Sequence, residues 1–302
     1  MKTIIAGGSG FLGRALARAL VTAEHDVVLL TRGAARGPSS GGRAVTWTPD
    51  GTLGPWAREI DGATAVVNVE GESIAGRRWN AAHKQRIRDS RVMATRSLAA
   101  AVRAAGRPPQ VFVNGSAVGY YGPRGDEVVT EDTPAGNDFL ARICVEWEAE
   151  AQAVGALTRL VLIRTGIVLD RHEGALPQML PPFWFGAGGP VGSGRQYWPW
   201  IHRADWVDLV RFAIQSPQAA GPLNATAPNP VTNAEFAAAL GRVLRRPAVL
   251  RVPGFALKLI LGEMAGPLLL SGQRAVPART EAIGVTFTFK LIDEALRSIF
   301  NR

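Results

Sequence analysis

Short apolar runs alternate with longer Ala- and Leu-rich stretches through the first two-thirds of the chain. We predict strands at residues 3–6, 27–31, 44–48, 65–69, 111–115, 159–165 and 223–225. Most of these runs are continuously apolar, which is typical of parallel strands covered by helices on both faces. Helical periodicity occupies residues 14–21, 205–214 and 233–244. The pattern predicts an α/β protein with a Rossmann-type, doubly wound parallel sheet.

The pattern changes after residue 166. Residues 174–200 are rich in Pro, Gly and aromatic residues, and we expect them to be too irregular for a helix or a regular sheet strand. Such a segment is a candidate binding element or lid, with simple apolar packing as the alternative. We therefore predict a Rossmann domain over residues 1–168, to which 203–226 return, and a smaller C-terminal substrate lobe over 169–302.

A glycine-rich turn follows the first predicted strand directly. Gly7, Gly10 and Gly13 are spaced three residues apart and precede a helical run. In a strand–turn–helix context this spacing indicates a dinucleotide site, because the glycines let the backbone approach a pyrophosphate at the helix N-terminus. We assign cofactor binding in this turn to Gly7, Ser9, Gly10, Phe11, Leu12 and Gly13.

The end of the second strand predicts which dinucleotide binds. An Asp or Glu about 20 residues past the glycines suits NAD, whereas an Arg suits the 2′-phosphate of NADP. This strand ends in Arg32, and the next acidic residue is Asp50. The sequence therefore favours NADP(H), with Arg36 and Arg43 as candidate helpers.

The amino-acid composition and net charge limit which classes of partner we expect the protein to bind. The net charge of +9 and pI near 10.7 would suit nucleic acid, but no nucleic-acid-binding module is recognisable, so we expect a small-molecule substrate instead. The single cysteine, Cys144, excludes an internal disulfide and lacks the neighbours that a zinc site needs. The first strand starts too early for a signal peptide, and no apolar run reaches membrane length, so we expect a cytoplasmic protein without membrane contact. The sequence leaves the oligomeric state open.

Several further motifs give the chain a family resemblance. They are Gly-Gly-Ser-Gly-Phe-Leu-Gly (7–13), Val-Val-Asn-Val-Glu-Gly (66–71), Ile-Ala-Gly-Arg-Arg-Trp (74–79), Ser-Arg-Val (90–92), Ser-Ala-Val-Gly-Tyr-Tyr-Gly (116–122), Arg-Thr-Gly-Ile-Val-Leu (164–169) and Pro-Trp-Ile-His (199–202). Together they resemble the extended short-chain dehydrogenase/reductase superfamily, and within it the sugar-nucleotide-epimerase-like "epimerase family" branch. The resemblance covers almost the whole chain.

The resemblance implies further cofactor contacts. The segment after the fourth strand, with Val69, Glu70 and Gly71, would lie along the ribose and pyrophosphate, although family members often have a small residue in place of Glu70. Arg91 replaces an asparagine that is common in the superfamily. The nicotinamide would lie near Thr165, Gly166 and Ile167.

The resemblance also implies substrate and catalytic residues. Ser116 matches a serine that bonds substrate, and Tyr120 and Tyr121 would reach the same cleft, although packing is an equal alternative for this pair. The Pro-Trp-Ile-His motif adds Trp200 and His202 on the substrate side. The substrate implied is a sugar nucleotide or another carbonyl compound.

One expected feature of the superfamily is missing. Its usual acid is a tyrosine with a lysine four residues later, but none of the three tyrosines here has Lys at that distance. Leu140 and Cys144 occupy the two places. Two hypotheses follow: an NADP(H)-dependent oxidoreductase or epimerase-like enzyme that uses Ser116, Tyr120 or Tyr121, or a non-catalytic NADP(H)-binding redox sensor or assembly protein.

Overall fold

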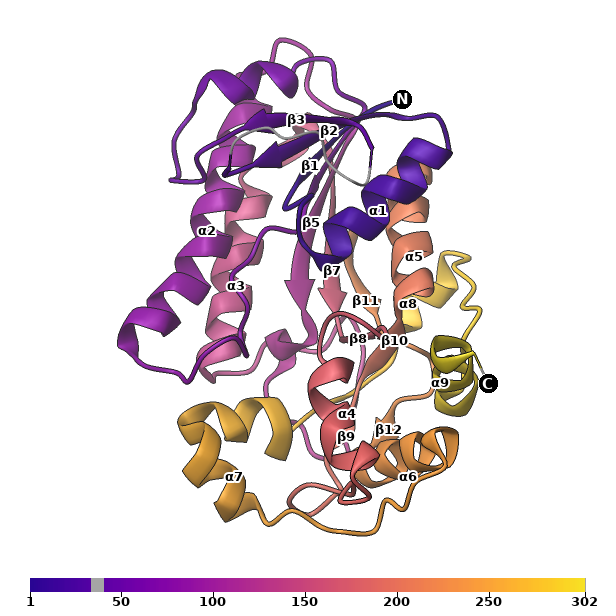
Figure 1. The fold of residues 1–302 in the computed structure, drawn as a ribbon. Coiled ribbons are helices and arrows are strands. Elements are labelled where there is room, and N and C mark those ends of the chain that lie inside the picture. Colours follow the sequence, from indigo (N-terminus) through magenta and orange to yellow (C-terminus); the bar gives the residue numbers. More distant parts are fainter. Residues whose placement is uncertain (34–40, 302) are drawn as a thin grey trace.

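A seven-stranded parallel sheet forms the centre of this computed structural model, which describes residues 1–33 and 41–301 (Figure 1). Its order is β11-β7-β5-β4-β1-β2-β3. The strands are β1 (Lys2–Ala6), β2 (Asp26–Thr31), β3 (Arg43–Thr46), β4 (Ala65–Asn68), β5 (Val111–Ala117), β7 (Arg159–Thr165) and β11 (Gly221–Ala225). All the predicted strands are present, and the order reverses between β1 and β4, so the doubly wound prediction is confirmed.

Helices cover both faces of the sheet. Figure 1 shows α1 (Phe11–Thr22) and α5 (Arg203–Gln215) on one face and α2 (Ala81–Ala104) and α3 (Phe139–Gln152) on the other. Neighbouring residues of one strand enter opposite cores, because successive side chains point to opposite faces. Ile5 packs in the core under α1 and α5, whereas Ile4 packs in the core under α2 and α3. Burial on both sides explains why the strand sequences are continuously apolar.

The remaining elements build a smaller lobe below the carboxyl edge of the sheet. Its helices are α4 (Leu176–Trp184), α6 (Asn233–Leu244), α7 (Gly254–Leu261), α8 (Ala278–Ala282) and α9 (Ile292–Phe300). Short strands pair as β8 (Ile167–Leu169) with β10 (Trp200–His202), β9 (Tyr197–Trp198) with β12 (Val231–Thr232), and β6 (Val128–Val129) with β13 (Arg274–Ala275). Short helical turns in or near this lobe are η2 (Val118–Tyr121), η4 (Gly262–Met264) and η5 (Gly266–Leu270), whereas η1 (Pro55–Glu59) packs against α2 and η3 (Gly155–Leu157) connects α3 to β7 in the sheet domain. β11 returns to the main sheet, while the domain boundaries stay a prediction.

Helix α4 corrects one expectation. Residues 174–200 were expected to be too irregular for a helix, yet α4 occupies part of them. Leu176, Leu180 and Phe183 are buried at helical spacing in the core of the lobe. Pro177 lies in the first turn, where its missing N–H costs no hydrogen bond. Apolar burial therefore outweighs the low helix propensity of the prolines further along. In the described chain, no helix is long and apolar enough to span a bilayer.

A buried ion pair joins the sheet to α3. The Arg164 guanidinium, on β7, donates from Nε to Glu148 Oε1 and from Nη2 to Glu148 Oε2, both at 2.9 Å. Both side chains are almost fully buried. Ser116 Oγ donates to the same carboxylate at 2.6 Å, and the Tyr120 ring lies 3.5 Å from the guanidinium carbon. The pair thus links β5, β7, α3 and η2.

A second buried chain of hydrogen bonds extends this network toward the C-terminal segment. Arg164 Nη1 donates to Tyr121 Oη at 3.1 Å, and Tyr121 Oη donates to Asn224 Oδ1 at 2.6 Å. Glu131 accepts from the backbone N–H groups of Asn224 and Arg279, each at 3.0 Å. The segment around α8 is therefore attached to the sheet edge by buried polar groups.

Loss of one partner of the buried pair should destabilise the protein strongly. Glu148→Ala leaves the Arg164 charge buried and uncompensated, so we expect the free energy of unfolding to fall by about 3–5 kcal/mol. Glu150→Ala is the matched control, since Glu150 lies on the same helix and its carboxylate pairs with Arg96 at the surface. That change should cost at most about 1 kcal/mol. Urea denaturation measures both, and equal losses would contradict the assigned role of burial.

His202 begins α5. Its Nδ1 accepts the backbone N–H of Ala204 at 3.1 Å, and its ring lies 4.0 Å from the ring of Phe289. Burial, and then the charge of Arg203, lowers the pKa of His202 to about 4. The neutral ring is therefore the form that the fold accommodates.

This lowered pKa predicts a loss of stability in mild acid. The unfolded chain binds the proton near pH 6.5, so protonation favours the unfolded state as the pH falls from about 6.5 toward 4. His202→Asn keeps a helix-capping acceptor but does not titrate. We expect the unfolding free energy of the parent to fall more between pH 7 and 5 than that of the variant, as measured by urea denaturation. Parallel pH profiles would show that His202 does not contribute.

Candidate cofactor and substrate site

A cavity of about 920 Å³ lies at the carboxyl edge of the sheet, between the sheet and the smaller lobe. Phe11 and Leu12 of α1 and Gly71, just after β4, line one end, together with Thr165 to Ile167 after β7. Open α/β sheets bind ligands in this position, near the point where strand order reverses. The cavity is therefore the candidate site.

The glycine turn beside this cavity is closely packed. A Cβ on Gly13 would lie 2.2 Å from the carbonyl oxygen of Gly7, and one on Gly7 would lie 2.8 Å from the backbone of Val69 and Glu70. Gly7 also has φ of +81°, which favours glycine. By contrast, a Cβ on Gly10 would meet only the Gly7 oxygen, at 3.3 Å. Two glycines hold α1 against the sheet, and the third leaves the start of the helix open.

Arg32, just after β2, and Glu70, just after β4, form an ion pair at the carboxyl edge of the sheet. Arg32 Nε lies 3.3 Å from Glu70 Oε1, with the arginine side chain 62% exposed and the carboxylate almost buried. Burial raises the pKa of Glu70, and the Arg32 charge opposes that effect. Of the two helper arginines, Arg43 forms an ion pair with Glu59, and Arg36 lies outside the described residues.

Arg91 extends from α2 to the cavity wall. Its Nη1 donates to the carbonyl oxygens of Glu72 at 3.1 Å and Ile87 at 2.9 Å, and its guanidinium carbon lies 5.4 Å from the ring of Trp147. Burial lowers the pKa of Arg91. No described carboxylate lies within ion-pair distance of it. Arg91 therefore places a positive charge, hydrogen-bonded to neutral groups within the described chain, against Gly71 at the end of the cavity beside the glycine turn.

The catalytic candidates lie behind the cavity wall. Ser116 and Tyr121 are buried in the Arg164 network, and burial raises the pKa of Tyr121 to about 12. Tyr120 stacks on Arg164 and, like the other two, is not part of the lining. The catalytic roles of these three residues stay predictions.

The places of the missing tyrosine and lysine are apolar. Leu140 packs in a small hydrophobic cluster with Ile143 of the same helix. Cys144 is buried, and burial raises the pKa of its thiol to about 12. Neither side chain supplies an acid in the neutral range.

The two predicted substrate residues, Trp200 and His202, also lie outside the lining. Trp200 is fully buried, and its Nε1 donates to the carbonyl oxygen of Asn229 at 3.2 Å. His202 begins α5, as described above. Their assignment to the substrate stays a prediction, while Trp198, two residues earlier, lines the cavity.

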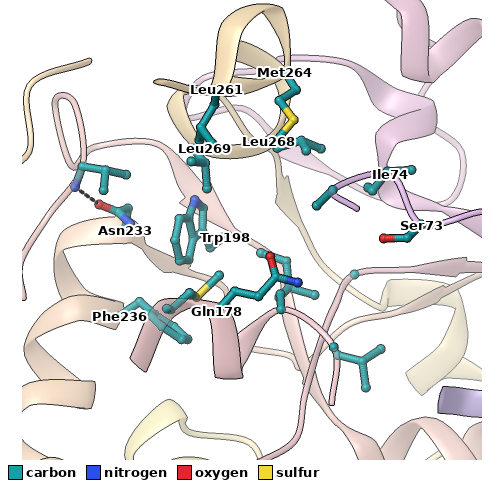
Figure 2. Close-up of a pocket in the computed structure, with 18 of the residues that line it drawn as sticks. Ser73, Ile74, Gln178, Trp198, Asn233, Phe236, Leu261, Met264, Leu268 and Leu269 are labelled. Atoms are coloured by element: carbon teal, nitrogen blue, oxygen red, sulfur yellow. Dashed lines mark hydrogen bonds between the residues drawn. The ribbon is translucent and has the colours of Figure 1, made fainter. Parts of the chain in front are cut away.

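Sequence reasoning missed most of the wall formed by the smaller lobe. Figure 2 shows Trp198 and Phe236 on one side of the cavity, Ser73 and Ile74 on the other, and Gln178 between them. The polar side chains in the lining are Glu72, Ser73, Arg91, Thr165, Gln178 and Asn233. Glu72 directly follows the predicted cofactor segment, which was an available signal. Gln178 lies on α4, which was not predicted, so no periodicity pointed to it. No metal-binding cluster occurs among the described residues.

Comparisons with known proteins place this site in a family. The model of the NAD dependent epimerase/dehydratase family matches residues 3–225, and that of a domain of unknown function matches residues 252–299. An epimerase family protein of Mycobacterium tuberculosis is 46% identical over 296 residues, which are 97% of this chain and 95% of that protein. Epimerase family protein SDR39U1 of Homo sapiens is 37% identical over 302 residues, 99% of each chain.

Two solved structures are similar as well. The crystal structure of human SDR39U1 (isoform 2) with NADPH superposes with a TM-score of 0.92 at 36% identity, covering 100% of both chains. A nucleoside-diphosphate sugar epimerase from Corynebacterium glutamicum gives 0.78 at 33% identity, covering 98% of this chain and 57% of that one. The resemblance seen in the sequence motifs is thereby confirmed, and the chain belongs to the NAD dependent epimerase/dehydratase family.

Proposed function

We propose that this protein is an NADP(H)-dependent oxidoreductase or epimerase-like enzyme that acts on a small carbonyl or hydroxyl compound. The observation that carries the proposal is one cavity that joins the glycine turn to the segment after β7 and continues into the smaller lobe. Such a shape suits a dinucleotide at one end and a substrate at the other. The NADPH in the structure of human SDR39U1 supports the choice of cofactor.

The residues at the cofactor end fit a dinucleotide. The open backbone around Gly10, at the N-terminus of α1, suits a pyrophosphate, because N–H groups and the helix dipole favour an anion there. Thr165, Gly166 and Ile167 line the cavity where the nicotinamide would lie. Arg91, beside Gly71, would add a positive charge between these two groups.

Arg32 and Glu70 would determine the preference for the 2′-phosphate. The exposed guanidinium of Arg32 can donate two parallel hydrogen bonds to a phosphate. The ion pair with Glu70 holds the Arg32 side chain in place just after β2, but the Glu70 carboxylate also repels a nearby phosphate. In our proposal NADP(H) binds by exchanging the Glu70 contact of Arg32 for the phosphate.

This exchange predicts opposite effects for the two side chains. Arg32→Ala should weaken NADPH binding about tenfold to hundredfold, because a charge-assisted contact is lost, and should change NADH binding little. Glu70→Ala should tighten NADPH binding several-fold by releasing Arg32. Fluorescence titration measures both. The double variant serves as the control: without Arg32, loss of Glu70 only removes its repulsion of the phosphate, so NADPH should bind slightly more tightly than in Arg32→Ala and much more weakly than in Glu70→Ala. Equal affinities of the parent for NADPH and NADH would overturn the assignment.

The proton chemistry can be assigned to the cavity wall. When bound, NADPH supplies a hydride, and reduction of a carbonyl to an alcohol also consumes one proton and leaves NADP⁺. Glu72 is the acidic side chain among the described lining residues, and its carboxylate has no hydrogen-bond or ion-pair partner within the described chain. We assign the proton transfer to Glu72, with Arg91 nearby to stabilise negative charge on oxygen. Ser116, Tyr120 and Tyr121 stay competing candidates.

The two assignments differ in which variant loses activity. If Glu72 transfers the proton, Glu72→Gln should lower NADPH-dependent turnover about 10²-fold, with NADPH affinity unchanged. Tyr120→Phe and Tyr121→Phe should each retain turnover within about twofold. The measurement is NADPH oxidation with a panel of aldehydes, ketones and sugar nucleotides. A loss confined to Ser116→Ala and one Tyr→Phe variant would instead support the competing candidates.

A second candidate function is a non-catalytic NADP(H)-binding redox sensor or assembly protein. The observation that favours it is the apolar pair, Leu140 and Cys144, in the places of the usual tyrosine and lysine. Tight NADPH binding without turnover across the whole panel would favour this function over the enzyme.

A further inference from the structure

The smaller-lobe wall of the cavity is almost entirely apolar. Figure 2 shows Leu261, Met264, Leu268 and Leu269 along one side, facing Trp198 and Phe236. Further lining side chains from the same lobe are Met179, Pro182, Phe183, Val191, Ala237 and Val252. A wall of this composition stabilises a ligand by about 25 cal/mol for each Å² of apolar surface removed from water. It provides little for a ligand whose surface is polar.

We propose that the substrate is a lipophilic carbonyl compound or alcohol with an extended hydrocarbon body, and not a sugar nucleotide. This inference rests on the proposed function for the reacting end of the molecule. The hydrocarbon body lies against the wall of the smaller lobe, and the reacting oxygen lies near Glu72, Arg91 and Thr165 at the cofactor end.

The distribution of charge supports this choice. A sugar nucleotide carries a pyrophosphate that needs cationic or multiple N–H partners. Arg91 is the basic side chain of the described lining, and it lies against Gly71 at the cofactor end. The opposite wall offers the amides of Gln178 and Asn233, and Asn233 Oδ1 already accepts the backbone N–H of Val191 at 2.7 Å. A second pyrophosphate would therefore meet no positive charge in this wall.

The apolar surface continues outside the cavity. Val252, just before α7, and Leu261, its last residue, line the cavity, whereas Phe255 and Leu259 on the same helix are 77% and 78% exposed. Contiguous exposed apolar patches mark ligand or partner sites, whereas single exposed apolar residues are common. A hydrocarbon chain longer than the cavity would thus meet apolar side chains as it emerges.

A binding experiment tests the proposal without requiring turnover. All-trans-retinal is titrated into the full-length protein, with and without NADPH, and quenching of tryptophan fluorescence is followed, with UDP-glucose titrated in parallel by calorimetry. We expect saturable binding of retinal and none of UDP-glucose. Leu268→Asn should weaken retinal binding at least about tenfold, because it replaces apolar surface in the wall by an amide. Leu157→Asn, an exposed leucine outside the lining, is the matched control and should bind as the parent does.

Turnover adds a second measurement. NADPH oxidation with straight-chain aldehydes from hexanal to dodecanal should show kcat/KM rising with chain length. If Leu268→Asn does not fold, as judged by circular dichroism, Met179→Gln replaces it, since glutamine has a similar shape.

The outcomes separate this inference from the proposed function. Saturable retinal binding that Leu268→Asn weakens, in a protein that binds no NADPH, would support the apolar site and refute the cofactor assignment. NADPH binding with UDP-glucose bound and retinal excluded would refute the lipophilic substrate and leave the proposed function standing. Retinal binding that is equal in the parent, Leu268→Asn and Leu157→Asn proteins would also overturn the inference, because it would show nonspecific adsorption.

Discussion

The buried pair of Arg164 and Glu148 constrains much of this structure. A guanidinium between the sheet and α3 must be neutralised and hydrogen-bonded, because an unpaired buried charge costs several kcal/mol. Glu148 provides the charge, and Tyr121 and the Glu131 carbonyl provide further acceptors. The groups that satisfy Arg164 come from η2, α3 and the segment after β6. One buried cation thus ties the turn after β5 and part of the C-terminal segment to the sheet edge.

The same constraint separates this site from the usual arrangement of the superfamily. The resemblance assigns substrate contacts to Ser116 and Tyr121, but their hydroxyl groups donate hydrogen bonds inside the Arg164 network. A hydroxyl that donates to a buried carboxylate costs free energy to redirect. The polar side chains that line the cavity come instead from the loop after β4 and from α2, β7, α4 and α6. In our proposal the proton is therefore transferred by Glu72, in the loop after β4, and not by Ser116 or Tyr121.

The sheet could be predicted from the sequence because two-sided burial leaves continuous apolar runs, and the glycine spacing predicted the close packing seen at Gly7 and Gly13. The smaller-lobe wall of the cavity could not be predicted from the sequence. Trp198 and Trp200 are two residues apart, yet Pro199 separates them into β9 and β10, which pair with different strands. Only that pairing puts one indole in the cavity and the other in the core. Likewise, α4 depends on burial of a few side chains that outweighs its prolines, which local sequence does not reveal.

In our proposal, different parts of this fold determine cofactor and substrate specificity. The cofactor end is built from backbone at the carboxyl edge of the sheet, where strand order and glycine contacts leave little freedom. The other end is built from side chains of α4 and β9, which pack in the core of the smaller lobe, and from the region from α7 to η5, whose Met264 packs with Ile87 of α2. Substitutions there can change the chemistry of the wall without disturbing the sheet. A family named for epimerases can therefore keep its dinucleotide geometry while the opposite wall becomes apolar, and the substrate must be inferred from that wall and not from the sheet.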